Sequence, residues 1–322
     1  MRKGLSVAAG TAVGLGFLWL ALRGIDVAAV RAVMAQASPL WLAAAVAALA
    51  AGYAARILRW RELLRSSRPD VTAAACAGPL LAGFALNNLL PLRVGDFARA
   101  FAFRERLGVP GPEVLGSLVA ERLLDLGSLV ASVAVGMAAL GEHRVPPAAV
   151  WAAEGAGLLC AVVFAALLST PSRVWDRFRG RSGVLGIAGR ILGALEILRA
   201  PRRLLRLIAL SLTAWACEAV MFMAVARALG LGLPLAAAPA ILGAATLSTM
   251  IPGTPGYVGT FDFFARQAVV ALGVPVDAAI AYAFLVHFVL WAPITLAGLA
   301  ALLANGMGLR ETIRRGRAAG AS

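Results

Sequence analysis

The chain has 322 residues, of which 61% are hydrophobic and 14% are charged, and its formal net charge is +14. A soluble domain is usually about half apolar, so this composition excludes an ordinary soluble protein. Several apolar runs approach the roughly 20 residues that a helix needs to cross a bilayer. The composition therefore predicts an all-α polytopic membrane protein.

The basic residues form short clusters between the apolar runs, and Lys3 is the only lysine among them. The excess of arginine and lysine in cytoplasmic loops explains such clusters, so the charge gives no reason to expect nucleic-acid binding. The three cysteines and two histidines show no metal-ligand spacing. We expect no metal, no disulfide and no cofactor.

The first half of the chain predicts two spans and a re-entrant hairpin. Residues 4–22 and 40–58 form the spans, and the basic segment 56–68 follows the second one. The apolar run 71–90 lies between two arginine-rich segments that should share the cytoplasmic side. A single crossing cannot satisfy this, whereas two half-helices that enter from the cytoplasm and turn near Pro91 can.

The second half predicts four spans, an amphipathic surface helix and a second hairpin that enters from outside. The spans are expected at residues 113–140, 150–168, 207–229 and 278–304. The surface helix is expected at 184–198, and the two arms of the hairpin at 235–251 and 261–272. The whole is about six full spans plus two hairpins, or eight helices on a looser count. It forms one transmembrane domain, 1–309, followed by a basic cytoplasmic tail, 310–322, and both termini are expected to be cytoplasmic.

The two hairpin tips resemble each other. LNNLLP at 86–91 and LSTMIP at 247–252 each end an apolar run with two small polar residues, two apolar residues and a proline. Tips of similar sequence that enter from opposite sides predict inverted-topology repeats, in which the substrate site lies near the midplane at broken helices. We therefore expect a polar cleft between the hairpins.

Prolines stop the incoming helices at these tips, and glycines permit tight turns and close approach of the backbone. The predicted hinge or gate residues are Pro91, Gly95, Pro252, Gly253, Pro255, Gly256, Gly259 and Asp262. The alternative for the second tip is a plain turn between two spans.

Four motifs also resemble a known family. R-I-L-R-W at 56–60, N-N-L-L-P-x-R-x-G-D at 87–96, E-R-L-L-D at 121–125 and I-P-G-T-P-G-Y-V-G at 251–259 are similar to the transmembrane domain of lysylphosphatidylglycerol synthases, also called the flippase-like family. The resemblance implies a protein of the bacterial or archaeal cytoplasmic membrane that translocates lipids or lipid-linked molecules. Because the sequence stops at Ser322 without the soluble synthase domain, we expect a stand-alone member that is not an enzyme.

Three charged residues follow Pro91: Arg93, Asp96 and Arg99. If a half-helix begins near Gly95, its N-terminus favours an anion, and Arg93 or Arg99 could clamp a lipid phosphate. The alternative is that Asp96 is an N-cap and that the arginines only follow the positive-inside rule.

Polar residues inside apolar runs are the other candidates for substrate binding. Asn87 could satisfy backbone groups freed by Pro91, or could bind a headgroup. Within one span, Glu121 and Asp125 share a helix face, and Arg122 is three residues from Asp125 and can pair with it. These charges either line a headgroup path or form a self-paired structural cluster.

Arg56 and Arg59 flank the end of a helix beside Trp60, where snorkelling arginines and an interfacial tryptophan are ordinary. The family resemblance alone makes these arginines site candidates. Glu218 lies inside an apolar span, so its default interpretation is functional, and we expect it to be buried.

These observations predict a translocator of an anionic phospholipid, or of a polyprenyl- or hopanoid-type lipid, between membrane leaflets. No G-x-x-x-x-G-K-[ST] motif occurs, so the chain is not itself an ATP-driven pump. Two alternatives stay open: a membrane component of a lipid aminoacylation or glycosylation system with a partner transferase, and a non-transporting scaffold for envelope biosynthesis.

Overall fold

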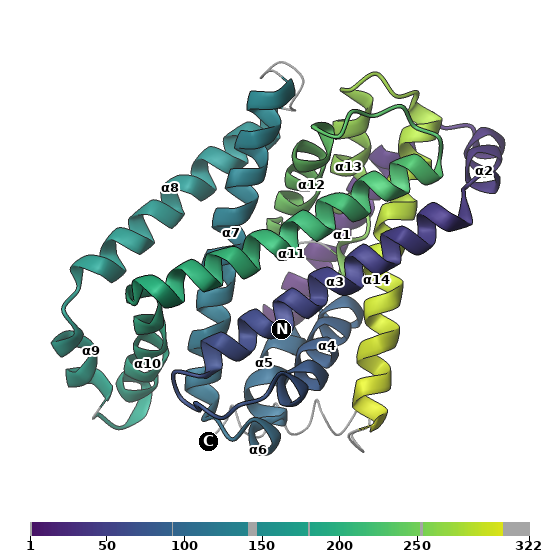
Figure 1. The fold of residues 1–322 in the computed structure, drawn as a ribbon. Coiled ribbons are helices and arrows are strands. Elements are labelled where there is room, and N and C mark those ends of the chain that lie inside the picture. The colour runs from purple at the N-terminus through teal and green to yellow at the C-terminus, as the bar shows by residue number, and fades with distance from the viewer. Residues whose placement is uncertain (1, 92, 141–146, 180, 252–253, 305–322) are drawn as a thin grey trace. The chain divides into compact units, whose positions relative to one another are not determined.

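A computed structural model describes residues 2–91, 93–140, 147–179, 181–251 and 254–304, and the regular elements in these ranges are all helices (Figure 1). Four of them are long and apolar enough to cross a membrane: α3 (Pro39–Leu64), α7 (Gly111–Leu140), α11 (Pro201–Ala228) and α14 (Val276–Ala304). The predicted all-α polytopic fold is confirmed.

Two bent pairs raise the number of candidate spans to six. α1 (Arg2–Leu22) bends by 84° into α2 (Val27–Ala35), and α8 (Pro147–Ser169) bends by 83° into α9 (Ser172–Arg179). The sequence analysis missed α2, although Asp26 caps it by accepting a hydrogen bond from the Ala28 N–H at 2.8 Å.

The remaining elements include both predicted hairpins and the predicted amphipathic helix. They are α4 (Ala73–Leu89), α5 (Val94–Phe97), the π-helix η1 (Ala98–Ala102), α6 (Arg104–Leu107), α10 (Gly183–Ala194), the 3-10 helices η3 (Leu195–Arg199), η4 (Ser248–Met250) and η5 (Pro255–Tyr257), α12 (Ala237–Leu247) and α13 (Thr260–Val270).

The chain folds into two compact units built from interleaved segments. Unit 1 comprises Met1–Gly52, Gly127–Gly157 and Ala214–Pro293, and unit 2 comprises Tyr53–Leu126, Leu158–Thr213 and Ile294–Ser322. Each unit contains one hairpin, because α4 and α5 belong to unit 2 whereas α12 and α13 belong to unit 1. The inverted repeats and the cleft between hairpins stay predictions, since they concern the relative placement of the two units.

In unit 2 the two arms of the hairpin are in close contact. A Cβ atom on Gly95 would lie 1.8 Å from the carbonyl oxygen of Gly83, so only glycine allows the arms this approach. The side-chain oxygen of Asn87 accepts a hydrogen bond from the Gly95 N–H at 2.8 Å. Asn87 therefore satisfies a backbone group beyond the break at Pro91, as one of the two predictions for it stated.

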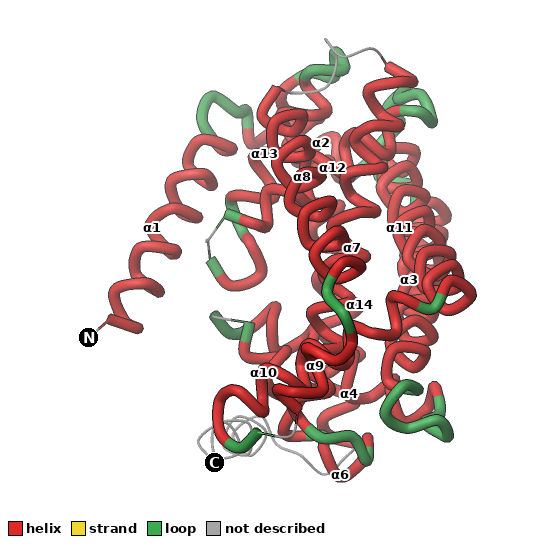
Figure 2. The backbone as a smooth tube through the Cα atoms, turned by 90° about the vertical axis from the view of Figure 1, so that its left-hand side faces the viewer, coloured by secondary structure: helices red, strands yellow, loops and turns green. Residues whose placement is uncertain are grey.

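In unit 1 the turn before α13 has left-handed backbone at Gly256 (φ 69°), Tyr257 (φ 61°) and Gly259 (φ 93°). A Cβ atom on Gly259 would lie 2.0 Å from the carbonyl oxygen of Gly14 in α1. Figure 2 shows α1 beside α13. The ring centroids of Phe17 in α1 and Phe263 in α13 lie 5.3 Å apart. Glycine at this turn therefore lets α1 pack against the second hairpin.

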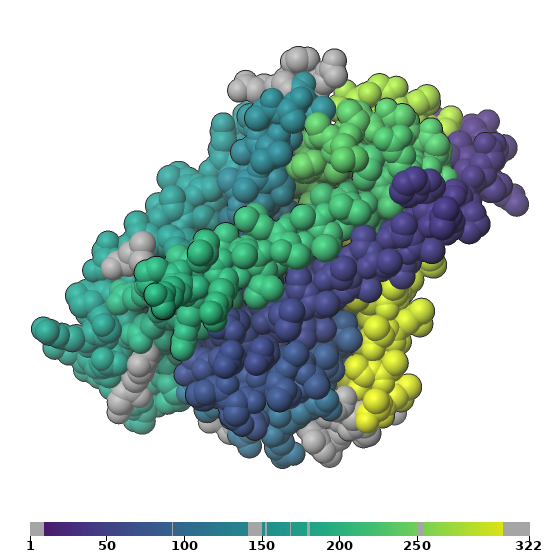
Figure 3. All heavy atoms as spheres, in the orientation of Figure 1, coloured from purple at the N-terminus to yellow at the C-terminus, as the bar shows by residue number. Residues whose placement is uncertain are grey.

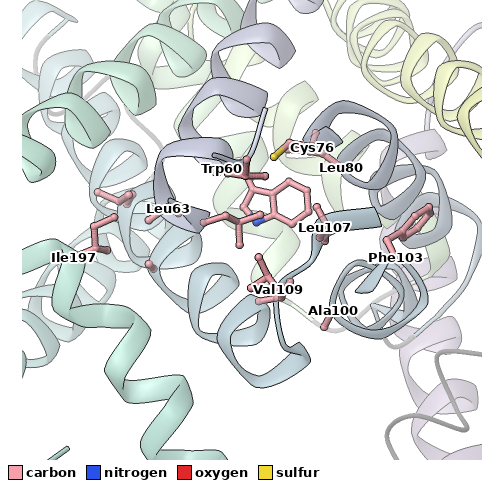
Figure 4. Close-up of a cluster of buried hydrophobic side chains, with 14 of the residues drawn as sticks. Trp60, Leu63, Cys76, Leu80, Ala100, Phe103, Leu107, Val109 and Ile197 are labelled. Atoms are coloured by element: carbon pink, nitrogen blue, oxygen red, sulfur yellow. The ribbon is translucent and has the colours of Figure 1, made fainter. Parts of the chain in front are cut away.

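The apolar core of unit 2 surrounds Trp60 (Figure 4). Its indole is 0% exposed among Leu63, Cys76 and Leu107, and its Nε1 donates to the Ser117 hydroxyl at 3.1 Å. The prediction of an interfacial tryptophan was therefore wrong. Hydropathy placed Trp60 at a helix end, whereas contacts with α4 and α6 bury it.

Large apolar side chains remain exposed on the spanning helices. Figure 3 shows α3 and α11 at the surface that faces the viewer, and both carry exposed leucine, valine or tryptophan side chains: Leu40, Trp41, Val46, Leu58, Leu205, Leu212 and Val220. In water such a surface would be a liability, but a lipid environment accommodates it.

Candidate functional site

The centre of the site in unit 2 is an ion pair between Arg99 of η1 and Glu121 of α7. The Arg99 Nη1 and Nη2 atoms donate to the Glu121 Oε1 and Oε2 atoms at 3.1 and 3.0 Å. Both side chains are only 1% exposed. The pair is bidentate, a geometry that is stronger and more directional than a single charged hydrogen bond.

The π-helix and a glycine position Arg99. A π-helical turn widens the helix by one residue and is frequent at functional sites. A Cβ atom on Gly83 would lie 2.6 Å from the Arg99 side chain, so a larger residue at position 83 would clash with Arg99. The Arg99 guanidinium lies 4.1 Å from the Trp60 ring centroid, a cation–π contact that offsets part of its desolvation.

A second ion pair joins α3 to α7. Arg59 Nη1 lies 2.6 Å from Asp125 Oδ1 and donates to the Ser211 hydroxyl of α11 at 2.9 Å, while Arg56 Nη1 lies 3.7 Å from the same Asp125 oxygen. Both arginines are buried. The snorkelling interpretation was therefore wrong, because these side chains are buried inside unit 2, where they pair with the Asp125 carboxylate.

Arg122 bridges the two ion pairs. Its guanidinium lies 3.5 Å from Glu121, 3.7 Å from Asp96 and 3.8 Å from Asp125. The pairing with Asp125 that the i, i+3 spacing predicted is therefore present. With 38% of its side chain exposed, Arg122 is the accessible arginine of this polar network.

Asp96 lies inside α5, where it accepts a hydrogen bond from Asn87 Nδ2 at 3.1 Å. The alternative interpretation of Asp96 as an N-cap was therefore wrong, and Arg93 occupies the cap position with a left-handed φ of 52°. A helix does begin near Gly95, as expected: α5 starts at Val94 and continues directly into the π-helix η1.

The structure thus unites eight predicted substrate-binding residues in one network: Arg56, Arg59, Asn87, Asp96, Arg99, Glu121, Arg122 and Asp125. Arg93 is exposed at the N-cap of α5, three residues before Asp96. Glu218 is buried as expected, but it belongs to unit 1.

The hinge residues divide between the units. Pro91 lies at the break between α4 and α5 and Gly95 at the contact of the two arms, both in unit 2. In unit 1 the predicted residues Pro255, Gly256, Gly259 and Asp262 form the turn and the first turn of α13. Pro252 and Gly253 lie outside the described residues.

The charges of the network favour an anion. Its four arginines, Arg56, Arg59, Arg99 and Arg122, outnumber the three carboxylates Asp96, Glu121 and Asp125, so the net charge is +1 when all are ionised. Arginine stays protonated in proteins, so the net charge of the network does not fall below +1.

Sequence reasoning missed His287 of α14 in unit 1. Its Nδ1 lies 2.8 Å from Asp262 Oδ1, and its Nε2 lies 2.8 Å from the carbonyl oxygen of Gly256. An ionisable residue inside the last apolar run was the signal that could have identified it.

Comparison with known proteins places the chain in a family. A family model described as the lysylphosphatidylglycerol synthase TM region matches residues 7–298. A relative from Haloferax volcanii, Glycosyltransferase AglD, is 26% identical, and the match covers 97% of this chain and 56% of that protein. The chain thus spans little more than half the length of this relative. Since the family model matches most of its residues, the chain belongs to the lysylphosphatidylglycerol synthase TM region family.

Proposed function

We propose that this multi-pass membrane protein translocates a lipid with an anionic headgroup between the leaflets of a cytoplasmic membrane. The observation that carries the proposal is the polar network of unit 2, which places seven charged side chains on or beside membrane-spanning helices with one excess positive charge. Charges in such helices are costly and usually mark a substrate path.

Within the network, the buried pairs form the framework and the exposed arginines bind the headgroup. Glu121 and Asp125 hold Arg99 and Arg59 in fixed positions. Arg122 is accessible and lies beside Asp96, and Arg93 is exposed three residues before Asp96. A phosphate group would receive hydrogen bonds from these two guanidinium groups, which match its geometry.

The acyl chains would stay in the bilayer while the headgroup moves along this network. The exposed leucine and valine side chains of α3 and α11 suit contact with lipid tails. Membership in a family named for a lipid synthase supports a lipid as the substrate. Both termini on the cytoplasmic side, as the loop charges predict, complete the proposed arrangement.

Leaflet exchange of a fluorescent phosphatidylglycerol in phosphatidylcholine vesicles tests the proposal. Exchange should be faster than in protein-free vesicles, and Arg122→Gln should slow it about tenfold to a hundredfold, because a hydrogen bond to a charged group contributes about 1.5–3 kcal/mol. Arg65→Gln is the matched control, since the Arg65 side chain is also 38% exposed but pairs with Glu62 instead. Equal exchange in the Arg122 variant, or none in the wild type, would refute the assignment.

The match to Glycosyltransferase AglD favours a second candidate function. The chain could be the membrane component of a system that glycosylates a lipid, with the transfer chemistry supplied by a partner transferase. Deleting the gene would then abolish a lipid-linked sugar in membrane extracts, while the purified protein would leave phosphatidylglycerol exchange at the protein-free rate.

A further inference from the structure

The second hairpin in unit 1 carries a buried pair of titratable groups that the polar network does not use. Asp262 is 1% exposed and the His287 side chain is 13% exposed. Asp262 Oδ2 accepts a hydrogen bond from the Gly259 N–H at 2.8 Å, and its other oxygen lies 2.8 Å from His287 Nδ1. The pair therefore connects α14 to the start of α13.

The hydrogen bonds around His287 require one additional proton. The Gly256 carbonyl oxygen can only accept, so His287 Nε2 must carry a hydrogen to bond it at 2.8 Å. A neutral imidazole then has a bare Nδ1 facing Asp262 Oδ1, which repels it if the carboxylate is ionised. Both contacts are favourable only when a proton lies between Nδ1 and Oδ1, either as an imidazolium or as a protonated carboxyl.

Both contacts act on the strained turn. Gly256 and Gly259 have positive φ angles, and Tyr257 adopts φ 61° although it has a side chain. Non-glycine residues in this region persist only when their surroundings hold them. The Asp262–His287 pair therefore contacts the turn at both ends, at the Gly256 carbonyl and at the Gly259 N–H.

Two polar side chains on the neighbouring elements are bonded to other groups. Arg266 donates to the Leu20 carbonyl at 3.1 Å, and the Tyr282 hydroxyl donates to the Phe222 carbonyl at 3.2 Å. The Phe261 ring lies 4.9 Å from the imidazole. The other charged or titratable residues that unit 1 contains on α11, the turn and α14 are Cys217, Glu218, Arg227, Tyr257 and Asp277.

We propose that Asp262 and His287 form a proton-binding site that locks the turn of the second hairpin. With this proton bound, His287 bonds the Gly256 carbonyl and Asp262 at the same time. After its release to solvent, the neutral ring has one N–H for two acceptors, so one of the two contacts opens. If the translocation proposed above is correct, this site couples it to a proton gradient.

Nitrogen-15 spectra of the histidine-labelled protein test the site directly, because the chain has two histidines and His143→Gln leaves only the His287 signal. At pH 7 we expect either two protonated ring nitrogens, or a neutral ring together with a protonated carboxyl band that Asp262→Asn removes from the infrared spectrum. A neutral ring beside an ionised Asp262 would overturn the proposal.

The coupling is tested in phosphatidylcholine vesicles with an imposed pH gradient. The gradient should accelerate phosphatidylglycerol exchange at least fivefold in the wild type and in the control Asp277→Asn, whose carboxylate instead accepts from the Asp26 N–H. In Asp262→Asn the rates with and without the gradient should be equal. If the gradient does not change the rate of wild-type exchange, the coupling is overturned. If no exchange occurs at all, the proposed function is refuted, and the spectra alone then test the proton-binding site.

Discussion

Replacing Glu121 by glutamine removes the charge partner of Arg99 and keeps nearly the same side-chain shape. Because both side chains are 1% exposed, water cannot replace the lost carboxylate. Breaking a buried ion pair by removing one partner costs about 3–5 kcal/mol, since it leaves an uncompensated charge. We therefore expect Glu121→Gln to lower the free energy of unfolding by about this amount, with the cation–π contact to Trp60 too weak to compensate.

The double variant Arg99→Met with Glu121→Leu separates burial of a lone charge from loss of packing. Replacing a buried pair by apolar side chains is often neutral, so the double variant should be more stable than Glu121→Gln alone. Tryptophan fluorescence during unfolding in mixed micelles measures this, because Trp60 lies against Arg99.

The matched control is Asp70→Asn, which breaks an exposed ion pair. The Arg68 and Asp70 side chains are 35% and 73% exposed, and such surface pairs contribute about 0–1 kcal/mol. The reasoning is refuted if Glu121→Gln costs no more than Asp70→Asn, or if the double variant costs as much as the sum of its single substitutions.

Three further substitutions test the hairpins. Gly95→Ala should prevent recovery of monodisperse protein on size exclusion, because its Cβ would lie 1.8 Å from the Gly83 carbonyl oxygen, whereas Gly127→Ala, with open space, should behave as wild type. Asn87→Ala should lower the free energy of unfolding by about 1–3 kcal/mol, because the Gly95 N–H loses its acceptor, and an unchanged denaturation midpoint would contradict this. Gly259→Ala should lower the melting temperature through both its φ of 93° and a clash with α1, and an unaltered melting curve would argue against that packing.

The sequence by itself determined the membrane class and the breaks in the helices. Apolar runs of span length can be stable only in lipid, and a proline ends a helix by local sterics. The i, i+3 spacing of Arg122 and Asp125 likewise determined their pairing, because helix geometry alone brings them together. These features depend on residues close in the chain, so pattern and spacing were sufficient.

Only the tertiary structure decided which distant groups meet. Arg59 and Asp125 are 66 residues apart in sequence, and Asp262 and His287 are 25 apart. The hydropathy pattern assigned Arg59 and Trp60 to a membrane interface because it indicates where a helix ends but not which other helices pack against that end. The partner of a buried charge depends on which sides of the helices are in contact. That contact is determined by the packing of the whole unit, and no local sequence pattern specifies it.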